Sequence, residues 1–312
     1  MNAIPVSQIT EQFAPTSIAL APNRPLLAVG GFEEDQIHIY DIEATPKRIK
    51  SLPMEWASCP VNSIVWANGF IAALGDGGTK CYVWSDVTYE QIRVIDLSAE
   101  LSSILSISVA NGHQLMLAGQ TQYGQEDKPD LYLYDTNDWS VFTLASGCFI
   151  NQARWNGRHI WILFNNYQDE GAEFTLRVLD VESGERIDNV LHQQEMSGSC
   201  ISVADGEVFV SGNNNQNGQQ TLLINTGVWE KSYQGESVSA LQPLAGGRVA
   251  VDIFNGNHFE IRMLDKVGQE KKLWSNRDAA SSLGIAADPQ GKYLAISRDN
   301  CVLLLDISGV LV

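Results

Sequence analysis

The chain has 312 residues, of which 44% are hydrophobic and 18% are charged. Aromatic and β-branched residues are spread along its whole length, which excludes a disordered chain, and the low charged fraction is typical of a sheet protein with polar, uncharged turns. Its 37 acidic and 20 basic residues give a formal net charge of −17. Because such a chain repels anionic surfaces, we expect neither nucleic acid nor membrane as a partner.

The first ten residues lack the basic start and the apolar run of a signal peptide. No stretch approaches the roughly 18 apolar residues of a spanning helix. The five cysteines are far apart and form no CxxC pair, so we expect free thiols in a reducing compartment: Cys59, Cys81, Cys148, Cys200 and Cys301. The sequence therefore predicts a cytoplasmic protein.

An apolar run that ends in an Asp-like residue recurs seven times along the chain. The runs end at Asp41, Ser85, Asp135, Asp180, Asn225, Asp265 and Asp306. Successive ends are 44, 50, 45, 45, 40 and 41 residues apart. A period of 40 to 50 residues with alternating apolar positions is typical of the blades of a β-propeller.

A tight-turn dipeptide precedes each of these runs. The dipeptides are Pro22-Asn23, Asn68-Gly69, Asn111-Gly112, Asn156-Gly157, Asp205-Gly206, Gly246-Gly247 and Gln290-Gly291. Asn-Gly and Asp-Gly favour a two-residue hairpin turn, because both central residues must adopt positive φ. They predict a hairpin of the first and second strands in each repeat, and a fourth strand follows the Asp-like residue in most repeats.

The predicted blades follow one another without a gap. Their approximate boundaries are 16–52, 61–97, 104–145, 150–191, 198–234, 238–275 and 281–309 with 4–10. The last repeat has no room for a fourth strand, and IPVSQIT at 4–10 is available to supply it. The sequence thus predicts one all-β domain: a seven-bladed propeller with four antiparallel strands per blade, closed by the N-terminal strand, which removes the exposed edges of an open ring.

Two stretches carry a family resemblance. LGIAADPQGKYLAIS at 283–297 and, more weakly, SIALAPNRPLLAVGG at 17–31 resemble the strand–turn–strand pattern of WD-repeat proteins. Tyr40-Asp41 and Tyr134-Asp135 match the Trp-Asp position of that family, and Trp84-Ser85 keeps the Trp. No repeat has the family's Gly-His dipeptide before its first strand, since Gly112-His113 lies in a predicted hairpin turn, so the family's Asp–His–Ser–Trp network is not expected. The chain resembles a divergent WD-repeat propeller, with related propeller families as alternatives.

Catalytic and cofactor motifs are absent from the sequence. It contains no HExxH, GxxxxGK[ST], GxSxG or GxGxxG. The Gly-rich stretch 75–80 is interpreted as a loop, because no helix follows to supply a phosphate-binding terminus. No histidine pairs with another His or Cys at metal-ligand spacing. We therefore expect no catalytic residue, no metal and no cofactor.

The candidate partner-binding residues lie on one face of the predicted ring. That face carries the loops between second and third strands and the links between blades, which are longer and more variable than the hairpin turns, and loops on a rigid scaffold commonly carry function. Its acidic loops, which include Asp130, favour a basic partner, and aromatic residues and Arg are typical of binding hot spots. The candidates are Phe13, Phe32, Glu33, Glu34, Trp56, Asp76, Tyr123, Phe149, Tyr167, Asp169, Met196, Phe254, Arg277 and Arg298.

These patterns favour a non-catalytic scaffold, or a subunit of a larger complex, that binds a protein or peptide. One alternative is a propeller enzyme of the lactonase or hydrolase type with an axial site, which would need ionisable groups or a metal near the central channel. The other is a small-ligand or glycan sensor that uses the polar loops of blades three to five. The oligomeric state is left open.

Overall fold

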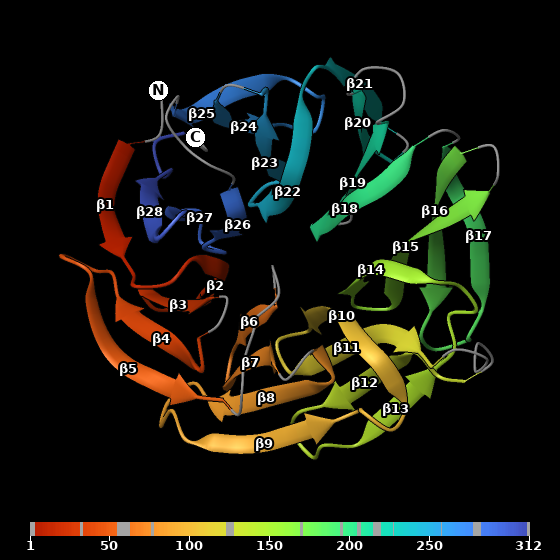
Figure 1. Cartoon of the computed structure of the whole chain (residues 1–312), viewed down its shortest axis with the longest axis horizontal. Coiled ribbons are helices and arrows are strands. Elements are labelled where there is room, and N and C mark those ends of the chain that lie inside the picture. Colours follow the sequence, from red (N-terminus) through yellow and green to blue (C-terminus); the bar gives the residue numbers. More distant parts are fainter. Residues whose placement is uncertain are drawn as a thin grey trace.

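The computed structural model describes residues 4–31, 34–54, 63–75, 78–122, 128–168, 171–193, 196–204, 207–214, 220–226, 228–256, 258–276 and 282–310. In these residues the chain forms seven four-stranded antiparallel sheets, arranged as blades around a central axis (Figure 1). The predicted fold class is confirmed.

Blades one to six each use four consecutive strands, with the first strand innermost. Blade one holds β2 (Pro15–Leu20), β3 (Leu26–Gly31), β4 (Gln36–Asp41) and β5 (Lys47–Pro53); blade two holds β6 (Ile64–Ala67), β7 (Phe70–Gly75), β8 (Lys80–Ser85) and β9 (Gln91–Asp96). Blade three holds β10 (Leu101–Ala110), β11 (Gln114–Thr121), β12 (Leu131–Asp135) and β13 (Val141–Leu144); blade four holds β14 (Ile150–Asn156), β15 (His159–Gln168), β16 (Gly171–Asp180) and β17 (Arg186–Gln193). Blade five holds β18 (Ser197–Ala204), β19 (Glu207–Asn214), β20 (Gln220–Asn225) and β21 (Trp229–Gln234); blade six holds β22 (Ser237–Leu244), β23 (Arg248–Phe254), β24 (Phe259–Leu264) and β25 (Glu270–Asn276).

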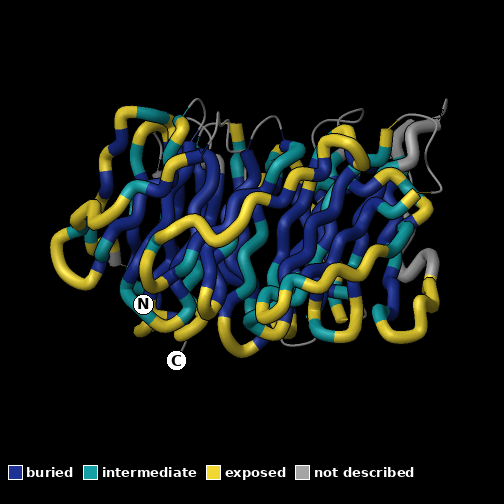
Figure 2. Tube along the Cα trace, turned by 90° about the horizontal axis from the view of Figure 1, so that it is seen from below, coloured by how far each residue is buried: buried dark blue, intermediate teal, exposed yellow. Residues whose placement is uncertain are grey.

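Blade seven is built from both ends of the chain. Its three C-terminal strands are β26 (Ser282–Ala287), β27 (Tyr293–Arg298) and β28 (Cys301–Asp306), and β1 (Ile4–Thr10) pairs antiparallel with β28 as the outermost strand. Both ends of the drawn chain therefore lie close together on one rim of the ring (Figure 2). The predicted closure is confirmed.

The hydrophobic core lies between neighbouring blades. Trp66 and Trp84 of blade two, 8% and 0% exposed, belong to one buried cluster with residues of blade one. Trp155 of blade four is buried in a cluster with blade three. Along the tube in Figure 2, burial concentrates in the middle of the strands and exposure at the two rims. Each blade is therefore stabilised by its neighbours.

Side chains also join the inner strands of successive blades. The inner edge of each sheet leaves backbone N–H groups without a sheet partner, and such groups need acceptors when they are buried. Ser17 Oγ accepts a hydrogen bond from the Ile64 N–H of the next blade at 2.9 Å. Ser108 Oγ accepts one from the Trp155 N–H at 3.2 Å, so the same arrangement recurs between blades three and four.

Candidate functional site

The strand order places loops at two ends of the ring. The variable face carries the loops between second and third strands and the links between blades, and the hairpin face carries the other turns. Seven candidate residues of the variable face lie outside the described residues: Phe32, Glu33, Trp56, Asp76, Tyr123, Asp169 and Arg277. The structure describes the backbone of the other seven. Some of their side chains are exposed, and others are packed in the protein.

Phe149 is the most exposed of the described candidates. It lies in the link between blades three and four, and 63% of its surface is accessible. We call residues 145–149 the Phe149 turn. Aromatic side chains dominate binding hot spots, so an exposed one on the variable face is a candidate contact for a partner.

The Phe149 turn is held by a set of hydrogen bonds. Asp130 accepts from the Ser146 backbone N–H at 2.7 Å and from its hydroxyl. Arg177 donates to the Ser146 carbonyl, and Arg186 donates to the Ala145 carbonyl at 2.5 Å. Because these partners come from blades three and four, the turn presents Phe149 from a fixed base.

Asp130 therefore has a structural role. The sequence predicted instead that it is a loop charge open to a partner. It is 5% exposed. Burial raises the pKa of Asp130, and its hydrogen bonds with Ser146 act in the opposite direction. Gly147 adopts a φ of 68°, a conformation that favours glycine, and completes the turn.

Two of the candidate side chains, Arg298 and Met196, are buried against a neighbouring blade, and a third, Phe254, stacks within its own blade. Arg298 is 4% exposed, and its guanidinium carbon lies 4.5 Å from the ring centre of Trp274 in blade six. Phe254 stacks on Phe259 with 4.6 Å between ring centres. Met196 is 7% exposed in the core cluster of blades four and five. The sequence placed all three in loops open to a partner, whereas the structure packs Arg298 and Met196 between blades and leaves Phe254 half-buried at the end of β23.

The other described candidates are half-buried or carry no side-chain description. Phe13 lies edge-on to His38 with ring centres 5.4 Å apart. Glu34 is half-buried beside the loop of blade one, and Tyr167 is described only as part of β15. The described candidates therefore do not form one aromatic cluster around the axis.

A buried polar cluster at the ring closure was missed by sequence reasoning. Glu11, in the link after β1, accepts a hydrogen bond from the Tyr40 hydroxyl at 2.7 Å and lies 3.1 Å from His38 Nδ1. Glu11 is 7% and His38 6% exposed. The available signal was the spacing of His38 and Tyr40, two residues apart on β4, which places both on one face of the strand. Glu11 lies in the link between blades seven and one, and His38 and Tyr40 reach it from the third strand of blade one.

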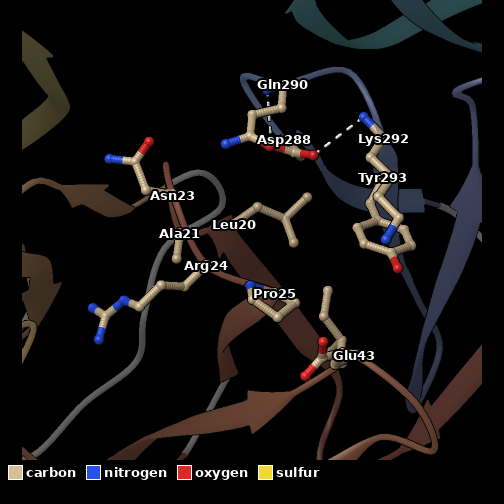
Figure 3. A pocket seen from close by; sticks show the side chains of 11 residues that line it. Leu20, Ala21, Asn23, Arg24, Pro25, Glu43, Asp288, Gln290, Lys292 and Tyr293 are labelled. Atoms are coloured by element: carbon tan, nitrogen blue, oxygen red, sulfur yellow. Dashed lines mark hydrogen bonds between the residues drawn. The ribbon is translucent and has the colours of Figure 1, made fainter.

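A groove of about 180 Å³ on the hairpin face lies between blades one and seven (Figure 3). Asp288 accepts from the backbone N–H groups of Gln290 and Lys292 at 2.8 and 3.1 Å, and Lys292 lies over the Tyr293 ring at 4.7 Å. Arg24 lines the groove and pairs with Asp86 at 2.8 Å. The side chains of Asp288, Lys292 and Arg24 are thus engaged in a turn, a ring contact and an ion pair. The groove therefore offers no nucleophile with an adjacent base.

A second cavity, of about 280 Å³, lies along the axis. It is lined by the inner strands of all seven blades.

Among the described residues no group of three or more His, Cys, Asp and Glu side chains is placed to hold a metal ion. No helix within the described part of the chain is long and apolar enough to span a membrane.

The structure is similar to solved β-propellers. Hydrazine synthase of Kuenenia stuttgartiensis matches with a TM-score of 0.73 and 11% identity, covering 98% of this chain and 99% of that chain. The β-propeller domain of Cps50 (Swd1) from Myceliophteria thermophila matches with a TM-score of 0.67 and 14% identity, covering 98% and 100%. The WD40 repeats of RRP9 match with a TM-score of 0.70 and 12% identity, covering 98% and 97%.

No protein-family model matches the chain, and no curated protein matches its sequence. At these identities the structural matches establish the fold alone. The chain has the fold of a WD-repeat-like seven-bladed propeller.

Proposed function

We propose that this protein is a non-catalytic binding module that takes a protein or peptide partner on its variable face. The observation that carries the proposal is Phe149: a 63% exposed aromatic side chain on a turn fixed by hydrogen bonds from two blades. A preorganised turn loses little conformational freedom on binding, which favours affinity.

The similar structures support this choice. Two of them are described as a β-propeller domain of Cps50 (Swd1) and as WD40 repeats of RRP9. The hydrazine synthase match is the observation that favours an enzyme. An axial active site would need an acid–base pair, and among the described residues that line the axial cavity the ionisable side chain is Arg154.

The partner in this proposal carries basic groups. The net charge of −17 steers positively charged surfaces toward the protein, and this steering weakens as salt screens it. The cytoplasm is the proposed location, in keeping with cysteines that are free at Cys81, Cys148, Cys200 and Cys301.

Affinity capture of the tagged protein from its native lysate tests the proposal. We expect a reproducible partner, identified by mass spectrometry, whose recovery falls between about 50 and 200 mM salt. Recovery of the bare protein at both salt concentrations would contradict the binding-module proposal. A salt-independent partner would contradict the basic partner alone.

A further inference from the structure

The polar side chains that line the axial cavity come from one half of the ring, where they alternate with the apolar residues Ile107, Val109, Val203, Leu241 and Pro243. These polar side chains are Ser108, Arg154, Ser202 and Gln242, which come from the consecutive blades three, four, five and six. Blades seven, one and two contribute aliphatic side chains, Ile285, Ile18, Ile64 and Val65. At about 280 Å³ the cavity is near the lower limit of small-molecule pockets, which begin at roughly 300 Å³.

Arg154 has no carboxylate partner within the described residues. Its Nη1 donates to Ser106 Oγ and to the Ala153 carbonyl, each at 2.9 Å. These two bonds leave Nε and Nη2 without a described acceptor. Arg154 is half-buried at the cavity wall, and this burial lowers its pKa.

Some other arginines of this chain, namely Arg24, Arg158 and Arg262, are paired with acids. Arg24 lies 2.8 Å from an Asp86 carboxylate oxygen, and Arg262 lies 2.8 Å from one of Glu236. In a chain with 37 acidic residues for 20 basic ones, acidic partners are plentiful. A guanidinium in the axial cavity that lacks such a partner therefore presents free donors to an anion from outside the chain.

Ser202 supplies a second, independent feature of the same wall. It lines the cavity from the inner strand of blade five and is 2% exposed, and its hydroxyl has no hydrogen-bond partner among the described residues. Buried hydroxyls are normally hydrogen-bonded, so the Ser202 hydroxyl is available to donate to a ligand seated against this wall.

We infer that the axial cavity binds a small organic carboxylate, with the carboxylate on the side of Arg154 and Ser202 and the aliphatic part against Ile18, Ile64 and Ile285. Guanidinium N–H groups match a carboxylate in a two-pronged hydrogen bond. The aliphatic wall selects a carboxylate with an apolar body over an inorganic anion. This inference does not depend on the partner proposed for the variable face.

Calorimetric titration with butanoate tests the inference, with butanamide as the uncharged isostere and inorganic phosphate as the anion without an apolar body. At constant ionic strength we expect the wild-type protein to bind butanoate at least about tenfold more tightly than either comparison compound. Arg154→Gln should weaken butanoate binding by about tenfold or more, whereas Arg93→Gln, an exposed arginine of β9 away from the axis, should leave it unchanged.

Equal binding of butanoate and butanamide by the wild-type protein, or no binding of butanoate at about 10 mM, would overturn the inference without recourse to any variant. Phosphate that binds as tightly as butanoate would overturn the organic class of ligand. Unchanged butanoate affinity in a folded Arg154→Gln protein would overturn the assignment to this cavity.

Discussion

Glu260 shows how a single buried charge is stabilised in this protein. It is 4% exposed in blade six and accepts hydrogen bonds from His258 and Arg262, each at 2.9 Å, and from Lys272. Burial alone would raise the pKa of Glu260, but the hydrogen bonds from Lys272, His258 and Arg262 outweigh burial and hold it at about 2. The carboxylate therefore stays charged well below the usual pKa of a glutamate.

This depressed pKa predicts a pH dependence of stability. The folded pKa lies below the unfolded value of about 4.3, so the stabilisation is present above that value and is lost as the pH falls toward 2. We expect Glu260→Gln to lower the free energy of unfolding by about 1–2 kcal/mol at pH 7 and by much less at pH 2.5, measured by urea denaturation.

Glu230→Gln on β21 is the matched control, because Glu230 is exposed. It should change the stability by less than about 0.5 kcal/mol at both pH values. A Glu260→Gln effect of the same size at pH 7 and pH 2.5 would contradict the assigned role.

At the residue scale, the sequence could not predict which candidate side chains are exposed and which are buried. Phe149 and Met196 both stand beside apolar strands in blade links, and nothing in their local sequence separates them. One is 63% and the other 7% exposed, because Met196 meets the core of the neighbouring blade. Arg298 is buried for the same reason, against rings supplied by blade six. Exposure at these positions depends on side chains that the neighbouring blade supplies.

At the scale of elements, the strands and hairpins were predictable from local chemistry. Alternation and the tight-turn dipeptides locate most hairpins because those signals act within a few residues. Blade four extends past its predicted boundary at 191: β17 runs from Arg186 to Gln193 and pairs with β16 as far as Phe174. The additional residues include His192 and Gln193, whose polar character carries no strand signal.

Hydrogen bonds between inner strands predict a measurable coupling of blades. Ser17 is fully buried, and its hydroxyl accepts from the Ile64 N–H of blade two. Ser17→Ala leaves that N–H without an acceptor, and we expect a loss of about 1–3 kcal/mol in the free energy of unfolding. Ser51→Ala on the outer strand β5, where the serine is half-buried, should cost less than about 0.5 kcal/mol. Equal effects of the two substitutions would contradict the coupling.

At the scale of the whole molecule, stability depends on closing the ring. β1 joins blade seven from the other end of the chain, and Ile9 on β1 is 4% exposed in a cluster with blades seven and one. Closure was predictable because the last repeat lacks a fourth strand, and residues 4–10 form a strand-like segment that belongs to no other repeat. The Glu11 cluster at the same junction was not, because its three side chains come together only when the ring closes.

Two substitutions on β1 test the closure. Ile9→Ala should lower the free energy of unfolding by about 2–4 kcal/mol, because it removes packing between two blades. Val6→Ala on the same strand, where Val6 is 48% exposed, should cost less than about 0.5 kcal/mol. Urea denaturation measures both, and a mild effect of Ile9→Ala would show that the ring is stable without this contact.

The central claim, that the variable face binds a partner through the Phe149 turn, is tested most directly by titrating the captured partner against Phe149→Ala and Phe142→Ala. Both phenylalanines are exposed, at 63% and 51%, but Phe142 lies on the outer strand β13. We predict that Phe149→Ala weakens binding by about tenfold or more, equivalent to at least about 1.4 kcal/mol, while Phe142→Ala changes it less than about twofold. Equal affinity of the wild-type protein and Phe149→Ala would contradict the claim.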